Sequence, residues 1–313
     1  MILSIILFII GIMLLVKGAD LFVGGGSGFA LRHSISPALI GFTIIAFGTS
    51  LPELVVSTNA AATGNTDIAL GNVLGSNIAN LALILALCTF VRPDMIVNSG
   101  TSRPMLIQHT RMMLVATAAF TLLAATLGTL GAFAGAVLLA LFAAILAILW
   151  RDCREERAAT PIKSRGWADA LYIGLGLVTV IIGAHLVVES AVAIAEGFGI
   201  PAFVIGLSVV AVGTSLPELA TSFVAAVRNE GAISVGNILG SNIFNLLLVL
   251  GVSLLIAPVT IGSLADIIAV FLFTVAILPL FSAHPSVVRG WSVLMLVGYA
   301  AYIAWSFGAA PFG

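Results

Sequence analysis

Charged side chains are scarce in this chain of 313 residues, because Asp, Glu, Lys and Arg together make up only 8% of it. A soluble domain carries about 25% charged residues, so this chain has too few to cover a surface exposed to water. Hydrophobic residues make up 61% instead. The composition therefore argues against a soluble domain and predicts a polytopic membrane protein.

Cysteine and histidine are also rare, with two and four residues respectively. Cys88 lies in an apolar run and Cys153 in a polar one, which gives neither a disulfide framework nor a metal-ligand spacing. The chain has no HExxH motif, and its histidines fall outside the duplicated segments described below, so those segments hold no Ser–His pair. We therefore expect a protein that is not an enzyme, with no resident cofactor and no nucleic-acid partner.

Ten apolar segments have the length of about 20 residues or more that a helix needs to cross a bilayer. The only long polar stretch, 151–165, follows the fifth of them. We predict an all-α membrane protein with a first five-helix repeat (1–150), a linker (151–166) and a second five-helix repeat (167–313). The ten expected spans lie near 1–31, 38–63, 68–91, 105–126, 129–150, 167–196, 202–227, 232–257, 262–281 and 289–308.

An odd number of spans in each half fixes the expected symmetry, because the second half then enters the membrane from the opposite side. The halves become inverted repeats. The basic residues support this count: when connections alternate between sides, 11 of the 12 Lys and Arg residues share one side, Lys17 being the exception. By the positive-inside rule that side, with the linker, is cytoplasmic, and both termini lie outside. We expect a prokaryotic inner (plasma) membrane protein, surrounded by lipid and functional as a monomer.

Two 40-residue segments, Gly41–Asn80 and Gly206–Asn245, match at 21 of 40 positions without a gap, at an offset of 165 residues. Both contain GTSLPEL, at Gly48–Leu54 and Gly213–Leu219, and both end in a GN(V/I)LGSN motif with a further Asn three residues later. Each copy thus places a proline and a glutamate inside an apolar span. A carboxylate and a helix breaker are both unfavourable in hydrocarbon, so the duplication predicts a paired ion site near the membrane midplane.

The GTSLPE segments supply hard oxygen ligands. Pro52 and Pro217 inside a helix would each free a backbone carbonyl, and the hydroxyls of Thr49, Ser50, Thr214 and Ser215 lie next to these breaks. The two carboxylates, Glu53 and Glu218, would repel each other unless a cation or protons neutralised them. These groups together predict a cation cage built from carboxylate, hydroxyl and carbonyl oxygens.

The second motif adds further polar groups to the same site. Ser and Asn spaced i, i+4 lie on one face of a helix, which pairs Ser76 with Asn80 and Ser241 with Asn245. Inverted pairing would bring both motifs together, with spans two, three, seven and eight broken around the site. Oxygen-only ligation favours Ca²⁺, Na⁺, Mg²⁺ or Mn²⁺ over zinc or copper. In the first span, Lys17 and Asp20 are spaced i, i+3, and we expect them to neutralise each other.

GTSLPE followed by GNVLGSN, duplicated in this way, resembles the calcium/cation antiporter superfamily, and specifically its prokaryotic sodium/calcium exchangers with ten helices. The resemblance implies that helices two, three, seven and eight hold Ca²⁺ or several Na⁺ while the long first and sixth helices slide across them. It implies Ca²⁺ ligation by the two glutamates. The Na⁺ ligands it implies are these glutamates, the hydroxyls of Thr49, Ser50, Ser76, Thr214, Ser215 and Ser241, and the carbonyls of Ala46 and Ala211, with Asn80 and Asn245 lining the centre.

Some relatives carry an aspartate where this chain has Asn80 or Asn245. The two neutral amides leave two acidic groups rather than three, which argues against K⁺ co-transport. The leading hypothesis is secondary active exchange of Ca²⁺ for Na⁺ by alternating access. The alternatives are a Ca²⁺/H⁺ antiporter that uses the same carboxylates, a passive cation channel and an intramembrane hydrolase.

Overall fold

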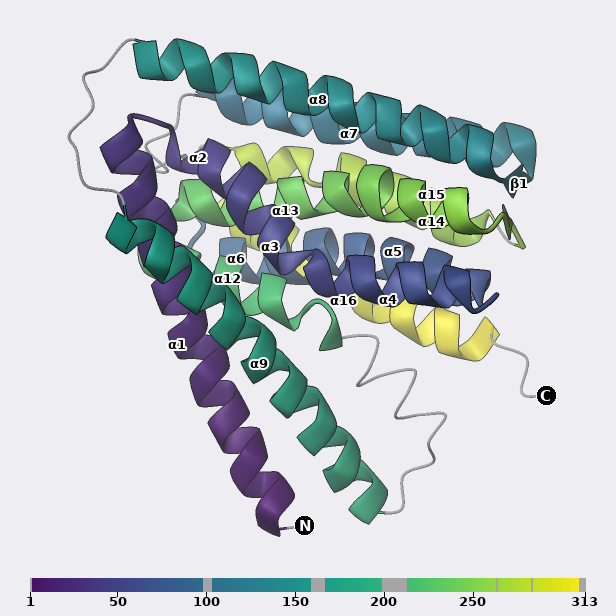
Figure 1. The fold of residues 1–313 in the computed structure, drawn as a ribbon, viewed down its shortest axis with the longest axis horizontal. Helices are drawn as coiled ribbons and strands as arrows, with labels where there is room; N and C mark the ends of the chain where they lie inside the picture. The colour runs from purple at the N-terminus through teal and green to yellow at the C-terminus, as the bar shows by residue number, and fades with distance from the viewer. Residues whose placement is uncertain are drawn as a thin grey trace.

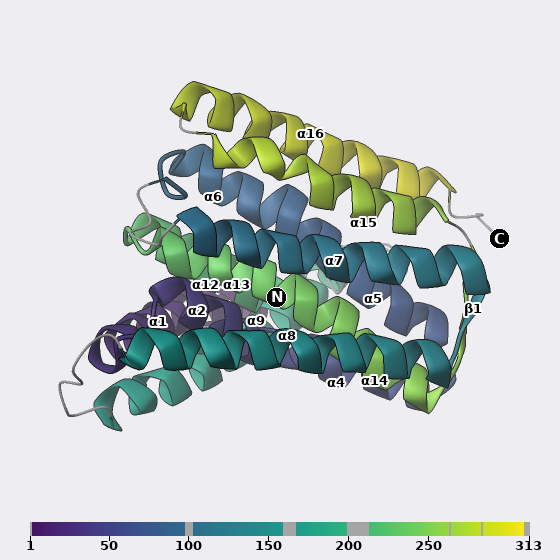
Figure 2. The same cartoon turned by 90° about the horizontal axis from the view of Figure 1, so that it is seen from above.

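The computed structural model describes residues 2–97, 103–158, 167–198, 213–262, 264–282 and 284–309. Helices account for nearly all of these residues, as expected where lipid offers the backbone no hydrogen-bond partners (Figure 1). Two short strands, β1 (Thr129–Leu130) and β2 (Val259–Thr260), pair antiparallel at one end of the bundle (Figure 2). The chain is therefore a helical membrane protein, as its composition predicts.

The described helices of the first half follow the expected order of spans. Their bounds are α1 (Ile2–His33), α2 (Pro37–Ile40), η1 (Gly41–Ile45), α3 (Ala46–Thr49), α4 (Leu51–Ala62), α5 (Thr66–Ala79), η2 (Asn80–Leu85), α6 (Ala86–Val91), α7 (Arg103–Leu127) and α8 (Ala132–Ala158). Helix α8 continues to Ala158, so the first part of the segment predicted as a linker is helical.

The second half repeats this order. Its described elements are α9 (Trp167–Gly197), α12 (Leu216–Val227), α13 (Gly231–Ile243), η4 (Phe244–Val249), α14 (Leu250–Ile256), α15 (Ala265–Ala276), η5 (Leu278–Phe281) and α16 (Pro285–Ala309). By length and apolar composition, seven described helices could cross a membrane, or eight if one bent pair counts as a single span. Two shorter apolar helices, Leu216–Val227 and Ala265–Phe281, correspond to the remaining expected spans. The count of ten therefore stays a prediction.

The second span is bent by 44° between α3 and α4. Ser50 is the residue at the bend, with φ −84° and ψ 2°, and Pro52 lies in the first turn of α4. Ser215 has nearly the same dihedral angles, φ −88° and ψ 5°, before Pro217 in the first turn of α12. The expectation of a proline inside each helix is wrong. Each proline lies instead in the first turn of a new helix. Amide groups in a first turn have no intrahelical acceptor, so a proline there removes no helical hydrogen bond.

The third and eighth spans are not broken, contrary to the prediction. Thr66–Val91 and Gly231–Ile256 each run as one membrane-length helix. Each contains a π-helical segment instead, η2 from Asn80 and η4 from Phe244. A π segment widens a helix by one residue per turn without ending it, and such segments are frequent at functional sites. The local irregularity thus falls where the sequence duplicates an asparagine.

The longest helices, α1 and α9, pack against each other along one side of the molecule and extend away from the other helices (Figure 1). Glycines make this crossing close: a Cβ added to Gly18 would lie 2.6 Å from the amide nitrogen of Val180. Gly183 approaches the amide nitrogen of Leu15 in the same way. Both residues of the second contact lie at an offset of 165 from those of the first, so the two helices exchange equivalent contacts.

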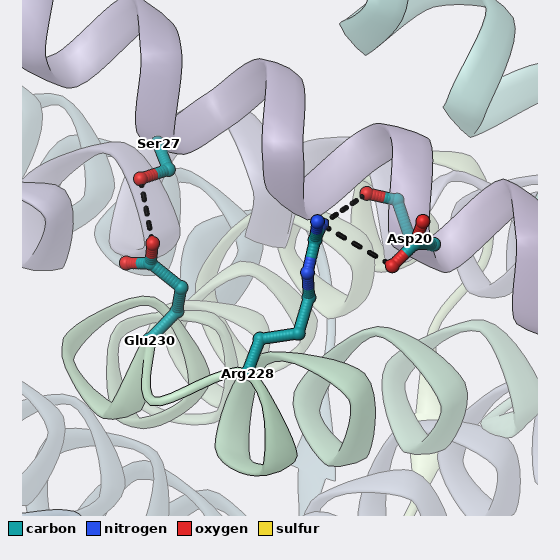
Figure 3. Close-up of polar contacts among 4 residues, drawn as sticks. All are labelled: Asp20, Ser27, Arg228 and Glu230. Carbon is teal, nitrogen blue, oxygen red and sulfur yellow. Dashed lines mark hydrogen bonds and ion pairs between the residues drawn. The ribbon is translucent and has the colours of Figure 1, made fainter.

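Polar contacts attach α1 to the connection between α12 and α13 (Figure 3). Arg228 Nη1 lies 3.2 Å from Asp20 Oδ1 and donates a hydrogen bond of 2.8 Å to the Asp20 carbonyl oxygen. Ser27 Oγ donates a 2.8 Å hydrogen bond to Glu230 Oε1. The expected pairing of Asp20 with Lys17 is thus wrong, because a cation from the second half of the chain reaches this carboxylate.

Helix α13 lies at the centre of the fold, and each of its residues is buried. It packs against α2, η1 and α7. Gly240 permits a close approach to α3, since an added Cβ would lie 2.6 Å from Cβ of Ala46. This contact with α13 therefore holds α3, and with it the α3–α4 bend, in position.

Candidate functional site

Two glutamates occupy equivalent positions at the starts of α4 and α12. Glu53 and Glu218 each lie in the first turn of their helix, because Ser50 and Ser215 end the preceding turn just before them. Both side chains are fully buried. The first turn of a helix carries a partial positive charge, which favours a carboxylate there. The duplicated break thus places two carboxylates inside the protein at matched helix N-termini.

The carboxylate oxygens are short of hydrogen-bond donors. Among the described residues neither oxygen of Glu53 has a hydrogen-bond partner, nor does Oε2 of Glu218. In the described part of the chain, Oε1 of Glu218 is the one of these four oxygens that accepts a hydrogen bond, from Ser50 Oγ at 3.3 Å. Ser50, the donor to Glu218, precedes Glu53 by less than one helical turn, so the two carboxylates lie near each other and their like charges repel. Buried carboxylates in this arrangement require neutralisation by a cation or by protons.

Hydroxyl groups from both halves surround these carboxylates. Ser50 of the first half reaches Glu218 of the second, as described above. Ser215 Oγ donates to Ser76 Oγ at 3.3 Å, and Thr49 Oγ1 lies 3.4 Å from Ser241 Oγ. Each of these contacts joins one half of the chain to the other. The hydroxyls predicted from the sequence therefore meet in one place.

The two asparagines among the predicted ligands have unpaired amides. Asn80 and Asn245 are fully buried, and neither the nitrogen nor the oxygen of either amide has a partner among the described residues. Asn80 begins the π segment η2, and Asn245 lies in η4. Buried amides usually form hydrogen bonds, so unpaired ones indicate room for a ligand or water. Both groups are suited to a cation through their oxygen atoms.

Two further asparagines contact the predicted ligands and were missing from the prediction. Asn237 Oδ1 accepts a hydrogen bond from Thr49 Oγ1 at 3.1 Å. Asn72 Oδ1 accepts one from Thr214 Oγ1 at 3.3 Å. The duplicated GN dipeptide at 71–72 and 236–237 is the signal that could have identified them.

The predicted carbonyl ligands have mixed outcomes. The Ala46 carbonyl oxygen accepts a 3.0 Å hydrogen bond from the Ser50 amide and lies 3.3 Å from Thr49 Oγ1. It therefore keeps an intrahelical partner and is not released by the break. Ala211 lies outside the described residues. Ten of the predicted residues are linked to this site by their contacts, their charge or their burial. They are Glu53, Glu218, Thr49, Ser50, Ser76, Thr214, Ser215, Ser241, Asn80 and Asn245.

This chemistry is that of a site for hard cations. All candidate ligand atoms are oxygens of carboxylates, hydroxyls and amides, the set that suits Na⁺, Ca²⁺ and Mg²⁺. Within the parts of the chain that the structure describes, no group of three or more His, Cys, Asp or Glu side chains is placed to hold a metal. Two carboxylates and several neutral oxygens are therefore what the site offers.

Carboxylates buried inside a helical membrane protein mark ion pathways. The fold and the site therefore indicate the class of integral membrane ion transporters. The family described as sodium/calcium exchanger protein matches residues 3–151 and 169–308. The chain belongs to the sodium/calcium exchanger family. It is therefore a membrane exchanger and not an enzyme, and the alternative of an intramembrane hydrolase is wrong.

Individual relatives match along nearly their whole length. Inner membrane protein YrbG of Escherichia coli is 35% identical over 332 residues, covering 99% of both chains. Sodium/calcium exchanger MaX1 of Methanosarcina acetivorans is 29% identical, covering 95% of this chain and 97% of its own. The solved structure of the sodium-calcium exchanger NCX_Mj, soaked with Na⁺ and Sr²⁺, superimposes with a TM-score of 0.82 at 30% identity, covering 97% of this chain and 98% of that one.

Proposed function

We propose that this chain exchanges Ca²⁺ for Na⁺ across the membrane by alternating access. One observation carries the proposal: Glu53 and Glu218, fully buried and close together, lack hydrogen-bond donors for three of their four oxygens among the described residues. Two negative charges are balanced by one divalent cation or by monovalent cations. The same site can therefore hold either ion, and occupation by one displaces the other.

The choice of Ca²⁺ and Na⁺ rests on the ligand atoms and on the relatives. Hydroxyl and amide oxygens beside carboxylates suit both ions. MaX1 and NCX_Mj are named as exchangers of sodium and calcium, and they resemble this chain over nearly all of its length. A Ca²⁺/H⁺ antiporter is the nearest rival, since protons could neutralise the same carboxylates. The many hydroxyls around them favour Na⁺, because a proton needs no such cage.

The proposal includes ten spans arranged as two inverted five-helix halves, 1–150 and 167–313. The reciprocal contacts of Gly18 with Val180 and of Gly183 with Leu15 support this arrangement, because a two-fold relation between halves produces such pairs. In this proposal the helix pair α1 and α9 slides across the central helices to open the site to either side. The linker then faces the cytoplasm, both termini face outward, and a single copy in the inner membrane suffices.

The coupling ion can be tested by flux. Purified protein is reconstituted into liposomes loaded with Na⁺ and diluted into Na⁺-free buffer containing ⁴⁵Ca²⁺. We expect Ca²⁺ uptake that depends on internal Na⁺ and persists with a protonophore, because Na⁺ leaving the site drives Ca²⁺ inward. Liposomes loaded with choline serve as the matched control.

Two other outcomes would contradict this proposal. Uptake that ignores Na⁺, follows an imposed pH gradient and collapses with the protonophore would assign the protein to proton coupling. Uptake that continues at the same rate without any internal counter-ion would indicate a passive channel.

A further inference from the structure

We propose that Asn72 and Asn237 are positioning residues that orient the hydroxyls of Thr214 and Thr49 toward a bound Na⁺. Each asparagine acts on the threonine of the opposite half of the chain. This inference rests on the proposed function, and it adds two residues to the machinery of that site. It explains why the GN dipeptide is duplicated along with the ligands.

The first arrangement is centred on Asn237 in α13, which is fully buried. Its Oδ1 is the nearest acceptor of Thr49 Oγ1 in the described structure, at 3.1 Å, with the carbonyl oxygens of Ile45 and Ala46 at 3.2 and 3.3 Å. Its Nδ2 donates to Ser222 Oγ in α12 at 2.9 Å. Since Ser222 engages the nitrogen, the amide oxygen is the atom that faces Thr49.

The second arrangement repeats the first with the halves exchanged. Asn72 in α5 accepts from Thr214 Oγ1 at 3.3 Å, and its Nδ2 donates to Ser57 Oγ in α4 at 2.9 Å. The same Nδ2 lies 3.5 Å from the backbone oxygen of Glu53. The three residues of each arrangement, Thr49–Asn237–Ser222 and Thr214–Asn72–Ser57, correspond one to one at the offset of 165.

The direction of the hydroxyl proton decides whether a threonine can bind a cation. A hydroxyl has one proton and two lone pairs. When the proton is donated to an amide oxygen, the lone pairs are free to face the ion. When an amide nitrogen faces the hydroxyl instead, it occupies a lone pair and turns the proton toward the site. In both arrangements the serine accepts from Nδ2. For Asn72 the backbone oxygen of Glu53 reinforces this orientation, because a carbonyl oxygen can accept from an amide nitrogen and cannot donate to an amide oxygen.

The expected effect is specific to the ion. Na⁺ binding uses the threonine hydroxyls, whereas Ca²⁺ binding depends mainly on the two carboxylates. We expect Asn237→Ala to raise the Na⁺ concentration for half-maximal binding about twofold to tenfold, the size expected for one lost hydrogen bond. The corresponding Ca²⁺ midpoint should change less than about twofold. A residue that only joined α13 to α12 would shift both midpoints alike.

A crossed set of double variants tests the assignment. Na⁺ and Ca²⁺ midpoints are measured from the thermal stabilisation of the detergent-purified full chain, because a ligand that binds the folded state raises its melting temperature. Asn237→Ala and Asn72→Ala are each combined with Thr49→Val and with Thr214→Val. We expect Asn237→Ala to have no further effect beside Thr49→Val but its full effect beside Thr214→Val. Asn72→Ala should show the reverse pattern.

Thr89→Val provides the matched control, since this buried hydroxyl donates to Leu85 of its own span and contacts Ser292 of α16, and none of these residues belongs to the site. It should lower the melting temperature without moving either ion midpoint. Equal shifts of Asn237→Ala in both threonine backgrounds would overturn the proposal, as would equal shifts for Na⁺ and Ca²⁺. If Asn237→Ala does not fold, Asn72→Ala in the same two threonine backgrounds tests the same claim. Absence of Ca²⁺ flux in the parent would count against the proposed function without altering this binding test.

Discussion

Replacing Glu53 or Glu218 by glutamine is expected to reduce Ca²⁺ exchange at least about a hundredfold. Glutamine keeps the size of the side chain and removes its charge, so a divalent ion would face one carboxylate instead of two. Removing one partner of a buried pair of opposite charges, here a carboxylate beside Ca²⁺, costs about 3–5 kcal/mol. Each 1.4 kcal/mol corresponds to about a tenfold change in affinity. Initial rates of ⁴⁵Ca²⁺ uptake into Na⁺-loaded liposomes measure the loss.

The same variants should show an opposite effect on the empty protein. Two buried carboxylates without a cation repel each other, so one glutamine is expected to raise the melting temperature in ion-free buffer and to weaken its further rise with Ca²⁺. Glu189→Gln is the control, because this side chain is mostly exposed on α9, and we expect it to exchange as the parent does. Exchange at the parent rate in either central glutamate variant would refute the assignment of these ligands.

Gly240→Ala is expected to destabilise the protein by about 1–3 kcal/mol, the usual cost of overpacking, and to reduce exchange about tenfold or more. The added methyl would lie 2.6 Å from Cβ of Ala46 and 2.9 Å from the carbonyl carbon of Phe42. Backbone cannot yield as a flexible side chain can. Because Phe42 and Ala46 belong to η1 and α3, the clash pushes Thr49 and the bend away from the site. Thermal unfolding and ⁴⁵Ca²⁺ flux on the same preparation measure both effects.

Gly290→Ala provides the matched comparison for this prediction. Gly290 lies in α16, and no described atom comes within 4 Å of an added Cβ. Alanine favours a helix over glycine by about 1 kcal/mol, so this variant should be as stable as the parent or more so. Similar losses of stability in Gly240→Ala and Gly290→Ala would show that close contact at α13 is not what holds the bend.

The duplication made much of the site predictable from sequence. Glu53 and Glu218 could be identified because a carboxylate in an apolar span is unfavourable unless it has a function, and the duplication at one spacing indicates a shared function. The hydroxyls followed from their places beside each glutamate. The duplicated GN dipeptides could have pointed to their asparagines, but not to the partners of these asparagines, which lie 188 and 142 residues away in the chain.

Local backbone geometry was harder to predict. Proline alone does not reveal whether a helix is kinked or starts anew. Here Ser50 and Ser215 precede the helices α4 and α12, and each proline lies in the first turn. The π segments leave no breaker residue to mark them. The contact of Asp20 with Arg228 was missed for a different reason, since a pattern in one span cannot show which residue of another span approaches it.

Competition between the two ions for one site is the central claim, and calorimetric titration of Ca²⁺ into the purified protein at several Na⁺ concentrations tests it most directly. If Glu53 and Glu218 hold either one Ca²⁺ or Na⁺, the apparent Ca²⁺ dissociation constant rises steadily with Na⁺ while the number of Ca²⁺ bound per chain stays the same. A Ca²⁺ affinity that does not change with Na⁺ would mean separate sites and would contradict the account.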